Sequence, residues 1–72
     1  MDPRVRLGKN VRRLRKALGV SQERFAHDSG IDRTYVSGIE RGVRNPTVTV
    51  IERFAVALSV DLHELLLPIG SD

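Results

Sequence analysis

The sequence has 72 residues, 40% hydrophobic and 29% charged, with a net charge of +3 and no cysteine, a composition typical of one small globular domain and not of a disordered chain. Disulfides and thiolate metal sites are absent without cysteine, and an enclosed substrate pocket would compete with the core for few apolar residues, so we expect no enzymatic activity, no metal ion and no cofactor. No stretch approaches the ~20 apolar residues of a membrane span, and the first residues lack the apolar segment of a signal peptide, so we expect a cytoplasmic protein that binds no membrane.

Two amphipathic helices are predicted in the first 30 residues. Leucine and valine recur at spacings of 4, 3 and 4 over residues 5–18, which is the stripe of a helix, and Gly19 ends it. Ser21 is a good N-cap for a second helix over about residues 22–29, which Gly30 ends.

Three further helices are predicted in the rest of the chain. A third covers about residues 33–41 after the capping residue Asp32. A fourth covers residues 48–58, although the five consecutive β-branched residues at its start favour a strand locally; we predict a helix because no second strand is available. Asp61 opens a short fifth helix over residues 62–66 as part of a capping box. The expected fold is all-α.

Basic residues are concentrated at the start of the chain. Residues 1–18 carry seven Lys or Arg against one Asp, whereas residues 47–72 carry one Arg against four acidic residues. A basic segment indicates a polyanion such as nucleic acid or an anionic membrane surface, but a solvated cationic helix explains the charge equally well. A membrane surface is not the expected partner, because the core needs the apolar stripe of the first helix.

Residues 22–41 have the spacing of a helix-turn-helix. Ala26 is a small residue where two crossing helices would touch, and Gly30 allows a tight turn with positive φ. Val36 and Ile39 share one face of the following helix and would point inward. Any helical hairpin with a glycine turn satisfies one of these conditions, but their coincidence favours the helix-turn-helix.

The chain shares a pattern with one family over about residues 5–66, and four stretches carry it: VRRLRKALGVSQERFA, GIDRTYVSGIERG, RNPTVTVIERFAVAL and VDLHELL. They resemble the Cro/phage-repressor, or XRE-like, helix-turn-helix transcriptional regulators of bacteria and phages. SGIERG and RNP are also similar to the controller proteins of restriction–modification operons, although many stand-alone regulators share them. The resemblance implies a single five-helix, lambda-repressor-like domain over residues 1–72 and a homodimer on a double-stranded DNA operator. No small-molecule effector is expected.

The second helix of such a motif enters the major groove of DNA. The resemblance and a helical wheel both place the base contacts at Arg33, Thr34 and Ser37. Arg33 would read guanine O6 and N7, with a phosphate contact as the alternative, and Gly38 is expected to let the backbone approach the DNA. The expected contacts with the DNA backbone are Gln22, Tyr35, Arg41, Arg44 and Asn45.

Two of these backbone contacts have an alternative interpretation. Gln22 is also an ordinary polar residue at a helix start, and Tyr35 points sideways on the wheel, where it would equally suit the edge of the core. The resemblance further implies an ion pair between Arg15 and Glu40 that orients the third helix. Two unrelated surface charges are the alternative there.

The end of the chain has more apolar residues than one face of a short helix can bury. Exposed apolar patches commonly mark partner contacts, and closure of the core is the alternative. The dimer interface is therefore expected at Leu62, Leu65, Leu66, Leu67 and Ile69.

These features predict a sequence-specific DNA-binding regulator that acts as a symmetric dimer on a two-fold operator. The alternative function is an antitoxin or another protein-interaction module built on a helix-turn-helix; the basic residues Arg33 and Arg41 favour DNA. His27, Asp28 and Ser29 do not form a catalytic triad, because consecutive helical residues point about 100° apart.

Overall fold

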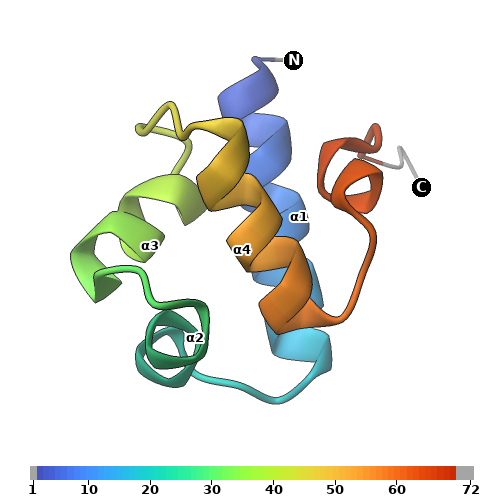
Figure 1. Cartoon of the computed structure of the whole chain (residues 1–72). Helices are drawn as coiled ribbons and strands as arrows, with labels where there is room; N and C mark the ends of the chain where they lie inside the picture. The colour runs from blue at the N-terminus through green and yellow to red at the C-terminus, as the bar shows by residue number, and fades with distance from the viewer. Residues whose placement is uncertain (1, 70–72) are drawn as a thin grey trace.

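The computed structural model describes residues 2–69, which contain five helical segments joined by short turns and loops (Figure 1). They are α1 (Pro3–Ala17), α2 (Gln22–Ser29), α3 (Arg33–Glu40), α4 (Val48–Leu58) and a 3-10 helix, η1 (Leu62–Leu66). No strand occurs within residues 2–69, and the β-branched run begins α4. The all-α prediction is confirmed.

The fifth segment differs in type from the prediction, because it is a 3-10 helix and not an α-helix. Five residues are too few for the α-helix nucleus to be stable by itself, and short 3-10 turns are common at such places. The carbonyl groups at its end bond to side chains of α1 and not to its own backbone. Only four of the five predicted helices are therefore α-helices.

Each α-helix is preceded by an N-cap residue whose side-chain oxygen accepts a hydrogen bond from a backbone N–H of the first turn. This bond satisfies one of the N–H groups that are left unpaired at a helix start. α1 starts two residues before its predicted beginning, because Asp2 caps it and Pro3 suits the first helical position. The capping oxygens belong to Asp2, Ser21, Asp32 and Thr47.

The turn between α2 and α3 depends on Gly30, which has φ +71°. This left-handed conformation strains residues with a Cβ atom. It lets the chain turn within the three residues between α2 and α3, so that α3 crosses α2 as a helix-turn-helix requires.

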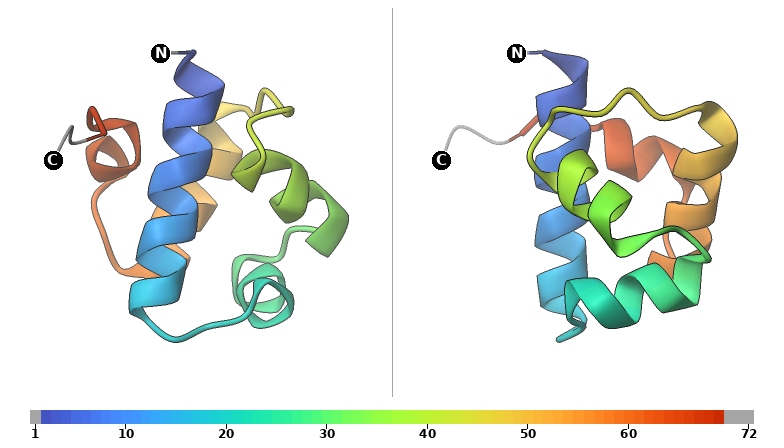
Figure 2. Two further views of the ribbon diagram at one scale, coloured as in Figure 1. Left: turned by 180° about the vertical axis from the view of Figure 1, so that it is seen from behind. Right: turned by 90° about the vertical axis from the view of Figure 1, so that its left-hand side faces the viewer.

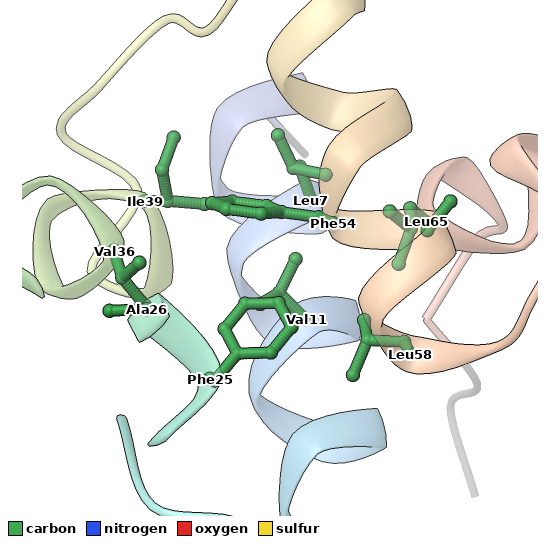
Figure 3. Close-up of a cluster of buried hydrophobic side chains, with 10 residues drawn as sticks. Leu7, Val11, Phe25, Ala26, Val36, Ile39, Phe54, Leu58 and Leu65 are labelled. Carbon is green, nitrogen blue, oxygen red and sulfur yellow. The ribbon is translucent and has the colours of Figure 1, made fainter. Parts of the chain in front are cut away.

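The core lies where α1, α2, α3 and α4 converge, and η1 closes its side (Figure 3). The rings of Phe25 and Phe54 meet near its centre, with centroids 5.1 Å apart. The inward direction expected for Ala26, Val36 and Ile39 is confirmed. The buried hydrophobic residues are Leu7, Val11, Phe25, Ala26, Val36, Ile39, Phe54, Ala55, Leu58 and Leu65.

Leu65 corrects one prediction for the dimer interface. Its side chain belongs to the core and is 0% exposed, because η1 turns this residue inward between α1 and α4. A residue with no exposed surface cannot contact a second subunit, so Leu65 stabilises the fold and is not part of an interface.

α1 lies between η1 and α3 (Figure 2, left). Its contact with α3 is very close at Gly8: a Cβ atom there would overlap the carbonyl oxygens of Ile39 and Glu40. The glycine therefore lets α1 pack directly against the backbone at the end of α3.

Candidate nucleic-acid interface

The beginnings of α2 and α3 form a polar hollow on the surface. Its volume is about 160 Å³, and its lining residues are Gln22, Arg33, Thr34 and Ser37. Arg33 and Thr34 are exposed and Ser37 is half-buried. The structure thus brings together the three residues expected to read bases and one residue expected to contact the DNA backbone.

A charged network fixes α3 from behind this surface. The Arg15 guanidinium bonds to Glu40 through two nitrogens, with Nε–Oε2 at 2.6 Å and Nη2–Oε1 at 3.0 Å. A third nitrogen, Nη1, donates to the carbonyl oxygen of Val20 at 2.8 Å. The side chains of Arg15 and Glu40 are only 10% and 3% exposed, so this ion pair lies inside the fold and not among surface charges.

Gln22 joins the same network, because its Nε2 donates to Oε1 of Glu40 at 3.0 Å. This bond ties the start of α2 to the end of α3 and holds the amide in place. One hydrogen of the amide is used in this way and the second remains for a further acceptor. Gln22 therefore has a structural role that its position at a helix start does not reveal.

The charged form of Glu40 is favoured by its surroundings. Burial alone would raise the pKa of Glu40, but the hydrogen bonds from Arg15 and Gln22 and the charges of Arg15 and Arg12 outweigh it, so the pKa lies below its ordinary value. The hydrogen bond to Glu40 likewise raises the pKa of Arg15. Both groups are ionised at neutral pH.

Arg44 lies across α3. Its guanidinium carbon is 5.3 Å from the centroid of the Tyr35 ring, which is within the range of a cation–π contact. A Cβ atom on Gly38 would lie 2.7 Å from Cγ of Arg44. Gly38 therefore makes room for the side chain of Arg44, and the half-buried Tyr35 supports Arg44. The approach of DNA to Gly38 stays a prediction.

The other two residues expected at the DNA backbone lie on either side of Arg44 in the sequence. Arg41 is the exposed C-cap of α3. Asn45 lines a separate hollow of about 90 Å³ near the start of α1. The structure thus places Arg41 at the end of α3, whereas Asn45 does not line the polar hollow.

The segment expected at a dimer interface is partly accessible. Leu66 and Leu67 are each 44% exposed, and Leu62 and Ile69 are half-buried. Within residues 2–69, Val48 and Val56 on α4 are other exposed apolar residues. Leu66 and Leu67 are therefore the most exposed apolar residues among those expected at the dimer interface.

A contact between α1 and this segment was not predicted from the sequence. Nδ2 of Asn10 donates to the carbonyl oxygens of Leu65 and Leu67, each at 3.0 Å, and Nη1 of Arg6 donates to that of Leu66 at 3.4 Å. A polar residue three positions after Leu7 on the apolar side of the helix was the available signal, because a buried amide needs partners.

Neither a metal centre nor a membrane helix is found in the described part of the chain. No three His, Asp or Glu residues within 2–69 come together in a way that could hold a metal ion, and His27 extends into solvent with 86% of its side chain exposed. Among the described helices, none has the length and apolar character needed to cross a membrane.

Known proteins share this arrangement. A family model described as helix-turn-helix matches residues 11–65. The uncharacterized HTH-type transcriptional regulator y4dJ of Sinorhizobium fredii is 44% identical over 68 residues, which cover 94% of this chain and 88% of that protein.

Solved structures are similar over most of the chain. The restriction–modification controller protein C.AhdI from Aeromonas hydrophila matches with a TM-score of 0.84 at 47% identity, covering 86% of this chain and 94% of that one. SinR, described as the master regulator for biofilm formation, was solved in complex with DNA and matches with a TM-score of 0.80 at 33% identity, covering 83% of this chain and 97% of that one.

Proposed function

The chain belongs to the helix-turn-helix family of DNA-binding transcriptional regulators, and we propose that it reads a specific double-stranded DNA sequence through α3, as a symmetric homodimer. The observation that carries this proposal is the polar surface at the start of α3. Exposed donor groups face outward there, while the ion pair of Arg15 and Glu40 fixes the helix from inside.

The proposed base contacts come from Arg33, Thr34 and Ser37. In a helix-turn-helix the residues at the start of the second helix meet base edges in the major groove, and these three line one hollow there. The fork of an arginine matches O6 and N7 of guanine, and hydroxyl groups can bond to a base or contact a thymine methyl group.

The proposed phosphate contacts surround these residues. The amide of Gln22 stands at the start of α2, where unpaired N–H groups and the helix dipole favour an anion. Arg41 and Arg44 follow on the other side of Ser37, with Tyr35 beside Arg44. Asn45 lines a different hollow, near the start of α1.

A dimer accounts for selective binding by so small a chain. A single recognition helix makes too few base contacts for both affinity and selectivity, whereas two copies about 34–36 Å apart reach successive major grooves on one side of the duplex. We assign the contact between copies to Leu62, Leu66, Leu67 and Ile69. The similarity to the controller protein C.AhdI favours the genes of a restriction–modification operon as those that this regulator controls.

The proposal is tested by selecting bound sequences from a pool of random duplexes and then comparing two arginine variants. On the selected DNA, Arg33→Ala should cost about 1–3 kcal/mol of binding free energy and relax the preference at one base position per half-site. Arg53→Ala removes an exposed arginine from α4, outside the helix-turn-helix, and should leave that preference unchanged.

A second test measures the affinity for the selected DNA as a function of salt concentration. The logarithm of the affinity should fall by about 0.9 per logarithmic unit of salt for each phosphate that the protein neutralises. A pool that yields no enriched sequence, together with a flat salt dependence, would exclude DNA as the partner and favour the protein-interaction module. Equal losses of Arg33→Ala on selected and random DNA would refute base reading by Arg33.

A further inference from the structure

Three consecutive carbonyl groups at the end of η1 are held by two side chains of α1. Asn10 donates from Nδ2 to the carbonyls of Leu65 and Leu67, both at 3.0 Å. Arg6 donates from Nη1 to the carbonyl of Leu66 at 3.4 Å. These carbonyls belong to the last two residues of η1 and to its C-cap, where backbone partners are lacking. We call Arg6 and Asn10 the α1 clip.

Asn10 is suited to this position by burial and by chemistry. It is 2% exposed, so its polar atoms need partners inside the protein. Its amide nitrogen bonds to two carbonyls, and its Oδ1 accepts from Nη2 of Arg13 at 3.3 Å. An apolar side chain of the same size would leave the carbonyls of Leu65 and Leu67 without donors.

The opposite side of α1 holds α3. Gly8 brings the helix against the carbonyls of Ile39 and Glu40, and Arg15 forms the ion pair with Glu40. At about 100° per residue, positions 8 and 15 lie roughly opposite positions 6 and 10 on the helix. Figure 2 (left) shows the result, with η1 on one side of α1 and α3 on the other.

We propose that the α1 clip fixes the position of residues 66–69, which carry Leu66, Leu67 and Ile69 of the proposed dimer contact, relative to α3. In this way α1 determines which spacing between half-sites the dimer accepts. This inference rests on the proposed function, in which that segment joins two copies and α3 reads DNA. Asn10 is a positioning residue in this scheme and does not touch DNA. One added base pair moves a half-site by about 3.4 Å and rotates it by about 35°. A dimer whose two copies of α3 are rigidly connected cannot contact both half-sites of such an operator, so its affinity falls.

The first measurement compares operators whose half-sites are separated by the selected spacing or by one base pair more or less. The parent should lose at least about tenfold in affinity on the altered operators, which is comparable to one mismatched base pair. Asn10→Asp keeps the size of the side chain but removes the donors. It should bring the three affinities within about threefold of one another and leave binding to a single half-site unchanged.

Val11→Ala is the matched control. Val11 is the buried residue next to Asn10 on α1. Its truncation removes apolar contacts and lowers the free energy of unfolding, as we expect of Asn10→Asp, but it leaves both side chains of the α1 clip in place. It should keep the spacing preference of the parent. A loss of this preference in both variants would attribute the effect to general destabilisation and overturn the inference.

The second measurement needs no DNA. The chain has no cysteine, so His27→Cys places one spin label per subunit at an exposed site on α2. The distance between labels in the dimer should have a narrow distribution in the parent and in Val11→Ala, and a broader one after Asn10→Asp. If Asn10→Asp does not fold, Arg6→Ala serves as the second variant and should broaden the distribution in the same direction.

The outcomes separate this inference from the proposed function. A narrow, unshifted distribution and a preserved spacing preference in folded clip variants would overturn the inference and leave DNA reading intact. If the protein binds DNA as a monomer, both the inference and the proposed dimer on a two-fold operator would be overturned. If no DNA sequence is selected, the proposed function fails, while the distance measurement still decides whether the clip holds the subunits.

Discussion

At the scale of single residues, Glu40 links the end of α3 to two other helices. Its carboxylate receives hydrogen bonds from Arg15 on α1 and Gln22 on α2. Removing one partner of a buried ion pair leaves the other charge uncompensated, which commonly costs about 3–5 kcal/mol. The core of a chain this small rarely contributes more than that, so the orientation of α3 and the stability of the fold depend on the same group.

Glu40 should make the fold sensitive to acid. Because its pKa is lower in the folded chain than its ordinary value of 4.5, its charge stabilises the folded state fully above that value. The stabilisation is lost as the pH falls through the folded pKa. Glu40→Gln leaves the Arg15 charge unpaired but keeps an oxygen that can accept one of its hydrogen bonds, so it should lower the free energy of unfolding by about 3 kcal/mol at neutral pH, the lower end of the range for a broken buried ion pair, and its difference from the parent should shrink below pH 4.5.

Urea unfolding at a series of pH values measures this difference. Glu52→Gln is the control, because Glu52 is an exposed carboxylate on α4, and its curve should follow the parent at every pH. Curves for the parent and Glu40→Gln that run parallel down to pH 3 would show that the charge of Glu40 does not stabilise the fold.

At the scale of elements, close packing of α1 on α3 depends on Gly8, and Gly38 on α3 has a different kind of neighbour. A Cβ atom on Gly8 would meet the backbone carbonyls of Ile39 and Glu40, which cannot turn aside. A Cβ atom on Gly38 would meet only the flexible side chain of Arg44. The same substitution should therefore have opposite consequences at the two positions.

Gly8→Ala should destabilise the fold by about 1–3 kcal/mol through overpacking, even though alanine favours a helix over glycine by about 0.5–1 kcal/mol. Gly38→Ala should leave the free energy of unfolding unchanged or raise it by up to about 1 kcal/mol, and should weaken DNA binding by displacing Arg44. Denaturant unfolding and DNA titration of both variants check this. A Gly8→Ala variant as stable as the parent would contradict the close approach of α1 and α3.

Most helix boundaries could be predicted from the sequence, because caps and apolar stripes are local signals. Ser21 and Gly30 bound α2 as predicted. The bonds from Asn10 join residues 55 and 57 positions apart, and no local pattern reveals them. The role of Leu65 was missed for the same reason, since a run of leucines does not show which of them a five-residue 3-10 helix turns inward.

The polar surface of α3 could be anticipated, but its support could not. Arg33, Thr34 and Ser37 share one side of an eight-residue helix, so a helical wheel brings them together. The bond from Gln22 to Glu40 and the place of Arg44 against Gly38 depend on how helices cross. Crossing geometry follows from side chains that are distant in the sequence, and the sequence alone leaves it open.

At the scale of the whole molecule, charge and apolar surface are separated along the chain. Residues 1–18 carry seven Lys or Arg against one Asp, whereas residues 47–72 carry one Arg against four acidic residues. The acidic part includes the 66–69 segment, which we assign to the contact between copies. A dimer built in this way keeps negative charge away from the DNA phosphates and favours one orientation on the duplex.

The dimer is tested by replacing both exposed leucines of the segment. Leu66→Ser with Leu67→Ser should halve the mass in solution and lower the affinity for the full operator toward the non-specific level, by about 10³-fold or more. The two side chains are each 44% exposed, and surface substitutions usually change stability by less than about 0.5 kcal/mol, so the variant should stay folded.

Leu18→Ser provides the matched control for this variant. Leu18 is 54% exposed and follows the last turn of α1, at the end of that helix opposite to Arg6, so its replacement should change neither mass nor affinity. Light scattering and operator titration of the three proteins decide the matter. If the double variant remains dimeric, the contact lies elsewhere, with Val48 and Val56 on α4 the exposed apolar alternative. If it becomes a monomer that binds the full operator as tightly as the parent, α3 needs no second copy to select its DNA.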